Sequence, residues 1–169
     1  MNILIIGTWY HARRIYIPYC IHSRESFGIN TIFWLDLDSQ HETIHKWSTQ
    51  QDYDKNINMC YIEDERKLDE IYISNIITRL VKTHNIQAVI ISTEPLSHLM
   101  YANICLRNNL SILLDKPITL EDDIVNDPAK SDKMLSDYTA LTRLYTKKYR
   151  AHWLHFDIMS QRRYKDAII

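Results

Sequence analysis

Residues 3–12 have the sequence ILIIGTWYHA, an apolar run that leads directly into a glycine. The run from Ile3 to Ile6 is short, continuously apolar and rich in β-branched residues, which is typical of a strand buried on both faces of a sheet. Gly7 is one of only two glycines in the chain, and it stands where a tight turn out of the strand requires its conformational freedom. Apolar residues at helical spacing then predict a helix over residues 11–23, weakened in its middle by Pro18.

The same alternation of strand and helix continues along the chain. Strand-like apolar runs are expected at residues 31–35, 58–62, 88–91, 110–114 and 153–159. Helices are expected at residues 39–47, 68–84, 97–108 and 133–149, and the polar segment 123–132 is expected to be a loop. Buried strands that alternate with helices predict a doubly wound α/β fold, in which a mostly parallel sheet carries helices on both faces within a single domain.

Length and composition narrow the classes of protein. The chain has 169 residues, 46% of them hydrophobic, and a net charge of −1, so nothing in its bulk electrostatics suggests nucleic acid or a membrane surface as partner. It lacks a signal-peptide pattern and an apolar run of about 18 residues, so we expect a cytoplasmic protein. Cys20, Cys60 and Cys105 are widely spaced and are interpreted as buried thiols. His41 and His45 are four residues apart on an expected helix, but no third ligand is evident, so no metal site is expected.

Ligands of such a fold bind beyond the carboxyl ends of the strands. Residues 7–12 compare with the dinucleotide fingerprint G-x-G-x-x-G/A, where Gly7 and Ala12 fit the first and third places. Trp9 stands at the second glycine, where its side chain would occupy the space of the pyrophosphate. This motif by itself leaves two readings open, a dinucleotide site and an ordinary turn between a strand and a helix.

Three further strand ends carry polar residues. Asp36 follows the second strand about where the fingerprint places its ribose-binding acid, which would favour NAD over NADP, although Asp36 and Asp38 could exchange roles or cap a helix. Residues 92–98 (STEPLSH) place hydroxyls before a helix, where they contact phosphate or ribose or serve as caps. Lys116, which follows Asp115, could polarise or protonate a substrate oxygen, or form a surface ion pair.

Together these segments resemble the Gfo/Idh/MocA family of oxidoreductases, which includes glucose–fructose oxidoreductase and inositol dehydrogenase. The most specific stretches are residues 89–98 (VIISTEPLSH) and 111–118 (SILLDKPI). The family carries there a strand ending in Ser/Thr and Pro, a Ser/Thr-His pair, a helix, and a strand ending in Glu-Lys-Pro, with Asp115 here in place of the Glu. Residues 156–164 are similar to the family's crossing strand, which leads into a second domain.

The resemblance implies NAD(P)-dependent hydride transfer on a sugar, a cyclitol or a similar polar alcohol or carbonyl. It implies a Rossmann-type dinucleotide-binding domain at residues 1–150, with the crossing strand and the start of a missing substrate domain at 151–169. Lys116 would be the catalytic residue, near the nicotinamide and the reacting carbon. Cofactor contacts would come from Gly7, Thr8, Tyr10 and His11 near the phosphates, Asp36 near the ribose, and Ser92, Thr93, Pro95, His98 and Asp115 at the nicotinamide half.

The function remains open between classes. The first hypothesis is an NAD(P)-dependent oxidoreductase or its cofactor-binding domain, inactive alone because the second domain normally supplies the substrate contacts. The alternative, motivated by Trp9, is a non-catalytic accessory or binding homologue that has lost the cofactor site. A receiver domain using Asp36, Thr93 and Lys116 is disfavoured, because the first strand lacks an acidic pair for Mg²⁺. Expected partners are a dinucleotide and a small polar substrate, with self-association or a partner subunit left open.

Overall fold

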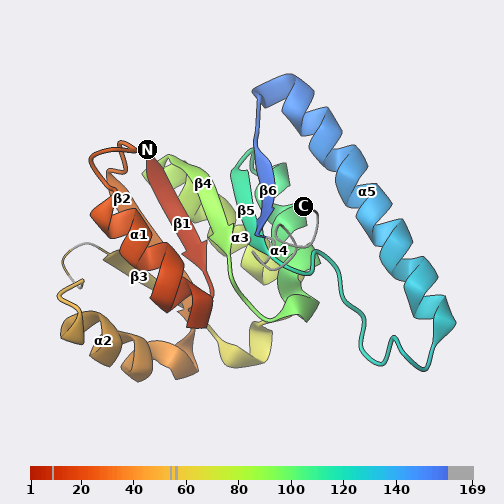
Figure 1. Cartoon of the computed structure of the whole chain (residues 1–169), viewed down its shortest axis with the longest axis horizontal. Coiled ribbons are helices and arrows are strands. Elements are labelled where there is room, and N and C mark those ends of the chain that lie inside the picture. The colour runs from red at the N-terminus through yellow and green to blue at the C-terminus, as the bar shows by residue number, and fades with distance from the viewer. Residues whose placement is uncertain (9, 54, 56, 160–169) are drawn as a thin grey trace, which may run out of the picture.

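The computed structural model describes residues 1–8, 10–53, 55 and 57–159, and it shows a sheet with helices on both faces (Figure 1). The strands are β1 (Asn2–Ile6), β2 (Thr31–Leu37), β3 (Ile57–Ile62), β4 (Ile86–Ile91), β5 (Ser111–Asp115) and β6 (Phe156–Met159). Every pairing is parallel, in the order β3-β2-β1-β4-β5-β6. This is the order of the Rossmann fold rather than that of receiver domains, and it confirms the predicted fold class.

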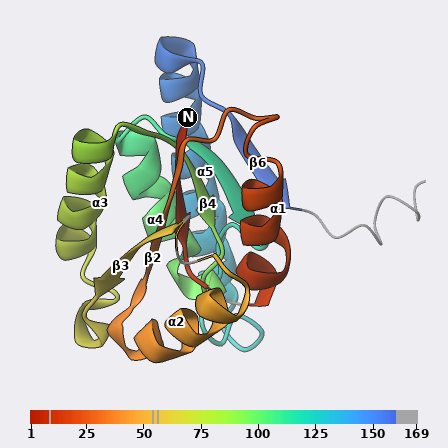
Figure 2. The same ribbon diagram turned by 90° about the vertical axis from the view of Figure 1, so that its left-hand side faces the viewer.

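Helices cover the two faces of the sheet in two groups. The π-helical turn η1 (Ala12–Tyr16), α1 (Ile17–His22) and α2 (His41–Gln50) pack on one face, whereas α3 (Glu70–His84), α4 (Pro95–Arg107) and α5 (Pro128–His152) pack on the other. Figure 2 shows α3 and α4 on one side of the strands and α1 on the other. Short 3₁₀ turns, η2 (Asp38–Gln40) and η4 (Asp64–Arg66), follow β2 and β3.

The first strand supplies both halves of the core. Leu4 and Ile6 belong to the cluster under α3 and α4, and Ile3 and Ile5 belong to the cluster under α1 and α2. Successive side chains of a strand point to opposite faces, so a strand in the middle of a doubly covered sheet must be apolar at every position. That requirement explains why the run at residues 3–6 could be assigned from sequence.

The helix after β1 is less regular than the predicted helix at residues 11–23. The Ile17 N–H donates to the Ala12 carbonyl five residues back, which makes a π turn instead of an α turn. Pro18 has no N–H to donate to the carbonyl of Arg14, so the regular hydrogen-bond ladder cannot pass through this segment. Both Tyr16 and Ile17 are buried at the widened turn.

Two predictions near the last helix were wrong. Helix α5 begins at Pro128 rather than at residue 133, because Asp127 Oδ1 accepts from the Ala129 N–H at 3.0 Å and proline is well tolerated in a first helical turn. The predicted loop therefore ends at Asp127. The strand expected at residues 153–159 begins only at Phe156, because Trp153 adopts the left-handed conformation that ends α5, with its side chain 76% exposed.

The cysteines behave as isolated thiols. Cys20 and Cys105 are buried, as predicted, whereas Cys60 is only partly buried. Burial raises the pKa of the Cys20 thiol to about 11, which keeps it protonated and unreactive at neutral pH. No helix in the described part of the chain has both the length and the apolar character needed to cross a lipid bilayer.

The tight turn at Gly7 leads to a prediction about stability. Gly7 has φ +85°, and a Cβ there would lie 2.4 Å from the Ser92 carbonyl oxygen, whereas Gly28 has φ +60° and open space around it. We expect Gly28→Ala to cost about 1 kcal/mol from backbone strain alone, and Gly7→Ala to cost roughly 3 kcal/mol or more because strand ends must also move. Urea unfolding followed by circular dichroism measures both, and equal losses would contradict the close approach.

Candidate functional site

A cavity of about 220 Å³ opens at the carboxyl ends of β1, β2 and β4, where the strand order reverses. Five of the predicted cofactor contacts line it: Gly7, Thr8, Asp36, Ser92 and Thr93. Its wall also contains Glu94 and Ser97 from the segment 92–98, and four polar residues that the sequence did not suggest, namely Arg13, Gln40, Lys67 and Tyr101. Several of these residues lie in the first turn after a strand. Because ligands of this fold bind beyond the carboxyl ends of the strands, that position could have identified them from the sequence.

Asp36 is the most unusual residue of this cavity. Its Oδ1 accepts from the Leu37 N–H at 2.7 Å, while its buried Oδ2 has no hydrogen-bond partner among the described residues. Burial raises the pKa of Asp36, and the Leu37 N–H, the donor groups of the nearby Thr8 and the charge of Arg13 oppose that rise. A buried acceptor without a donor is costly, so a ligand that supplies hydroxyl donors fits this position.

The charges in the cavity wall have mixed signs. Arg13 is half-buried and close enough to lower the pKa of Asp36 by its charge, whereas Lys67 and Glu94 are exposed. Exposed charges are screened by water and salt, so the half-buried Arg13 has the larger effect on a bound anion. The cavity therefore combines an unsatisfied carboxylate oxygen with a cation suited to phosphate.

A second cluster surrounds Asp115, at the end of β5. The Tyr16 hydroxyl donates to Asp115 Oδ1, and the Ser92 hydroxyl donates to Asp115 Oδ2 at 2.6 Å. His11 Nδ1 lies 3.7 Å from the same Oδ2, and the His11 side chain is half exposed. Ser92 belongs to both the cavity and this cluster. Ser92 and Asp115, predicted as cofactor contacts, are thus bonded to each other.

His98 lies in the interior rather than on an open surface. It is 1% exposed, its Nδ1 lies 2.7 Å from the Pro117 carbonyl oxygen, and its Nε2 lies 3.1 Å from the Thr93 carbonyl oxygen. It therefore lies between the turn before α4 and the segment after β5, with one ring nitrogen facing a carbonyl oxygen of each. Lys116 is exposed between Asp115 and Pro117, and the Lys116–Pro117 peptide is cis.

Two other predicted residues lie outside the cavity wall. Tyr10 is 59% exposed, accepts a hydrogen bond from the Arg14 guanidinium, and has that group 5.3 Å from its ring centroid. Pro95 is the first residue of α4. Trp9, on which the alternative function depended, lies outside the described residues.

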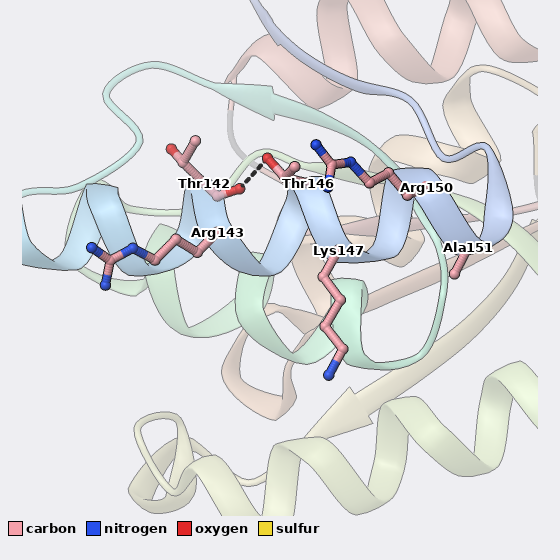
Figure 3. Close-up of a pocket in the computed structure, with 6 residues that line it drawn as sticks. All are labelled: Thr142, Arg143, Thr146, Lys147, Arg150 and Ala151. Carbon is pink, nitrogen blue, oxygen red and sulfur yellow. Dashed lines mark hydrogen bonds between the residues drawn. The ribbon is translucent and has the colours of Figure 1, made fainter.

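A larger hollow of about 570 Å³ lies along the outer surface of α5, lined by Thr142, Arg143, Thr146, Lys147, Arg150 and Ala151. Figure 3 shows Lys147 and Arg150 extending in different directions, so the cations do not converge on one anion. Arg150 lies in the last turn, where positive charge complements the helix dipole. Within the described ranges, no three His, Cys, Asp or Glu side chains are grouped to hold a metal ion. The strand-end cavity is therefore the candidate site.

Comparisons with known proteins identify the class of domain. Residues 1–136 match the family described as "Oxidoreductase family, NAD-binding Rossmann fold", whereas no curated protein matches the sequence. Similar solved structures include a Gfo/Idh/MocA family oxidoreductase from Vibrio cholerae (TM-score 0.62, 14% identity, 94% of this chain and 38% of that one). Others are the dehydrogenase MviM from Clostridium difficile (0.58, 15%, 94% and 38%) and the UDP-N-acetylglucosamine 3-dehydrogenase GnnA from Acidithiobacillus ferrooxidans (0.53, 13%, 94% and 37%).

A parallel sheet in the Rossmann order, with its cavity at the point of reversal, defines an NAD-binding domain of the oxidoreductase class. The chain belongs to the Gfo/Idh/MocA oxidoreductase family, which confirms the resemblance seen in residues 89–98 and 111–118. It spans little more than a third of the length of the structures it matches.

The burial of Asp36 leads to a prediction about pH. Its folded pKa lies above the unfolded value of about 3.9, so between the two the folded chain binds more protons and the free energy of unfolding falls as pH rises. In the Asp36→Asn variant the side chain does not ionise, so this fall in the free energy of unfolding does not occur. We expect the variant to be more stable than the wild type at neutral pH, with the difference disappearing toward about pH 4. Urea unfolding across this pH range measures it.

The exposed neighbour Asp38 provides the control, since Asp38→Asn should leave the pH dependence unchanged. A wild type that is more stable than the Asp36→Asn variant at neutral pH would show that the carboxylate is fully compensated.

Proposed function

We propose that the strand-end cavity binds the adenosine end of NAD, and that the chain is the cofactor-binding domain of an oxidoreductase acting on a sugar, a cyclitol or a similar polar alcohol or carbonyl. The observation that carries this proposal is the buried Oδ2 of Asp36, an acceptor without a partner in the wall of the cavity. The two adjacent hydroxyls of a ribose are donors of the right kind for a carboxylate.

The remaining contacts follow from the neighbouring elements. The turn from Gly7 to Thr8 and the Arg13 guanidinium lie where the pyrophosphate of a Rossmann cofactor approaches the first helix. A cavity of about 220 Å³ is smaller than typical sites for whole ligands, about 300–1,000 Å³, so it accommodates one end of the dinucleotide. The other end would extend toward Ser92 and Asp115.

NAD is favoured over NADP by the balance of charges. A 2′-phosphate would place its negative charge against the Asp36 carboxylate, which repels it. The positive charge of Lys67 would attract a 2′-phosphate, but Lys67 is exposed, so water and salt weaken this attraction. The charge of Arg13 already acts on the Asp36 carboxylate. The repulsion by Asp36 is therefore the larger effect.

Lys116 is proposed as the catalytic residue of the nicotinamide end. Lys116 is exposed directly after β5, where its ammonium group would polarise or protonate the reacting oxygen, while the bound dinucleotide would supply the hydride chemistry. We assign residues 1–150 to the dinucleotide domain and residues 151–169 to the crossing strand toward a substrate domain. A sugar substrate accords with the name of the Acidithiobacillus enzyme, a UDP-N-acetylglucosamine 3-dehydrogenase. The chain alone should show weak or no turnover.

Titration of the purified chain with NADH and NADPH tests the proposal. We expect NADH to bind at least about 10-fold more tightly than NADPH, a difference of about 1.4 kcal/mol. Asp36→Asn should weaken NADH binding by roughly 10-fold or more, because the ribose loses a charged acceptor, and should affect NADPH much less. Fluorescence of the nicotinamide and calorimetry measure both.

Asp38→Asn is the matched control, because Asp38 is the exposed acid two residues further along. If that variant, rather than the Asp36 variant, loses NADH, the ribose acid has been assigned wrongly. Absence of binding by either nucleotide at millimolar concentration would favour a non-catalytic homologue.

A further inference from the structure

The family fingerprint assigns no function to Tyr16, yet its side chain reaches the site. Tyr16 is 4% exposed and ends η1, the turn that follows Gly7 and Thr8. Its hydroxyl donates to Asp115 Oδ1 across a separation of 99 residues in the chain. The widened turn allows Tyr16 to be buried together with Ile17, which packs in the core under α1.

Both oxygens of the Asp115 carboxylate are held by buried hydroxyls. Tyr16 donates to one oxygen, and Ser92, which is 1% exposed, donates to the other at 2.6 Å. Burial raises the pKa of Tyr16, and the adjacent Asp115 carboxylate raises it further, so the phenol remains a donor at neutral pH. The carboxylate therefore has little freedom to rotate.

The backbone on the other side of Lys116 is held as well. The Pro117 carbonyl oxygen lies 2.7 Å from His98 Nδ1, and the other ring nitrogen of His98 lies 3.1 Å from the Thr93 carbonyl oxygen. The residues before and after Lys116 are thus both anchored to buried side chains of other elements, while the Lys116 side chain itself is exposed. A short backbone segment fixed at both ends determines the direction in which its central side chain leaves.

We propose that Tyr16 is a positioning residue, which fixes the Asp115 carboxylate and thereby sets the direction of Lys116 at the nicotinamide end of the site. The alternative is a core tyrosine whose hydroxyl is merely satisfied by the nearest acceptor. The inference rests on the proposed function for its effect on the cofactor, but its structural part does not require that any nucleotide binds.

The structural part is tested without a ligand. In the ¹H–¹⁵N spectrum of the nucleotide-free chain, Tyr16→Phe should shift the amide resonances of Asp115 and Lys116. Tyr19→Phe removes an exposed hydroxyl from α1, the helix that directly follows η1, and it should leave those resonances in place. Unchanged Asp115 and Lys116 resonances in the Tyr16→Phe variant would overturn the inference, whatever the chain binds.

The functional part compares NADH with ADP-ribose, which lacks the nicotinamide. We expect Tyr16→Phe to weaken NADH about 3–10-fold, in the range of one lost hydrogen bond, and to leave ADP-ribose affinity unchanged. Its effect should disappear in the Asp115→Ala and Lys116→Ala backgrounds, because Tyr16 acts through those residues. If the tyrosine were merely structural, Tyr16→Phe would lower the free energy of unfolding, and it would either leave NADH affinity unchanged or weaken NADH and ADP-ribose equally.

The outcomes separate the two proposals. If the resonances shift but wild type binds neither NADH nor ADP-ribose, the proposed function fails and the positioning geometry stands. If wild type binds both and Tyr16→Phe binds NADH equally well, positioning by Tyr16 is wrong and the proposed function stands. Should Tyr16→Phe fail to fold, Asp115→Ala removes the same link from its other end, with the same expected loss for NADH alone.

Discussion

The ends of β1 and β4 approach each other at Gly7 and Ser92 so closely that no side chain fits between them. The Ser92 N–H donates to the Ile6 carbonyl at 2.8 Å, and the Gly7 N–H donates to the Leu35 carbonyl at 2.9 Å, so the ends of β1, β2 and β4 are joined. The chain can leave β1 toward η1 only through a left-handed turn at this junction. Every group of the site is positioned relative to it.

Ser92 connects two regions that differ in how their polar groups are satisfied. On one side, Asp36 retains a buried oxygen without a partner among the described residues, which is the character of a binding surface. On the other side, Asp115 receives hydroxyl donors on both oxygens, which is the character of a rigid support. A site needs both, since a ligand must gain hydrogen bonds and the groups that meet it must not move.

The carboxylate that we propose as the ribose ligand also opposes folding. Burial of Asp36 raises its pKa, and Thr8, Leu37 and Arg13 compensate for only part of that effect, because the pKa remains above its usual value. A residue that stabilised the fold alone would not keep an acceptor in this state. The sequence located Asp36 correctly at a strand end, because parallel strands place their carboxyl ends together, but it could not show that one oxygen lacks a donor.

Local sequence determined the strands and their polar ends, because a doubly covered strand must be apolar throughout, as at residues 3–6, and the residues after it begin at the ligand-binding edge. Residues 89–98 and 111–118 also indicated the family to which the chain belongs. Tertiary structure alone decided that Tyr16 meets Asp115, since the two are 99 residues apart and no spacing rule joins them. It likewise decided that His98 faces the interior, because a histidine in a first helical turn satisfies the same pattern whether it contacts ligand or backbone.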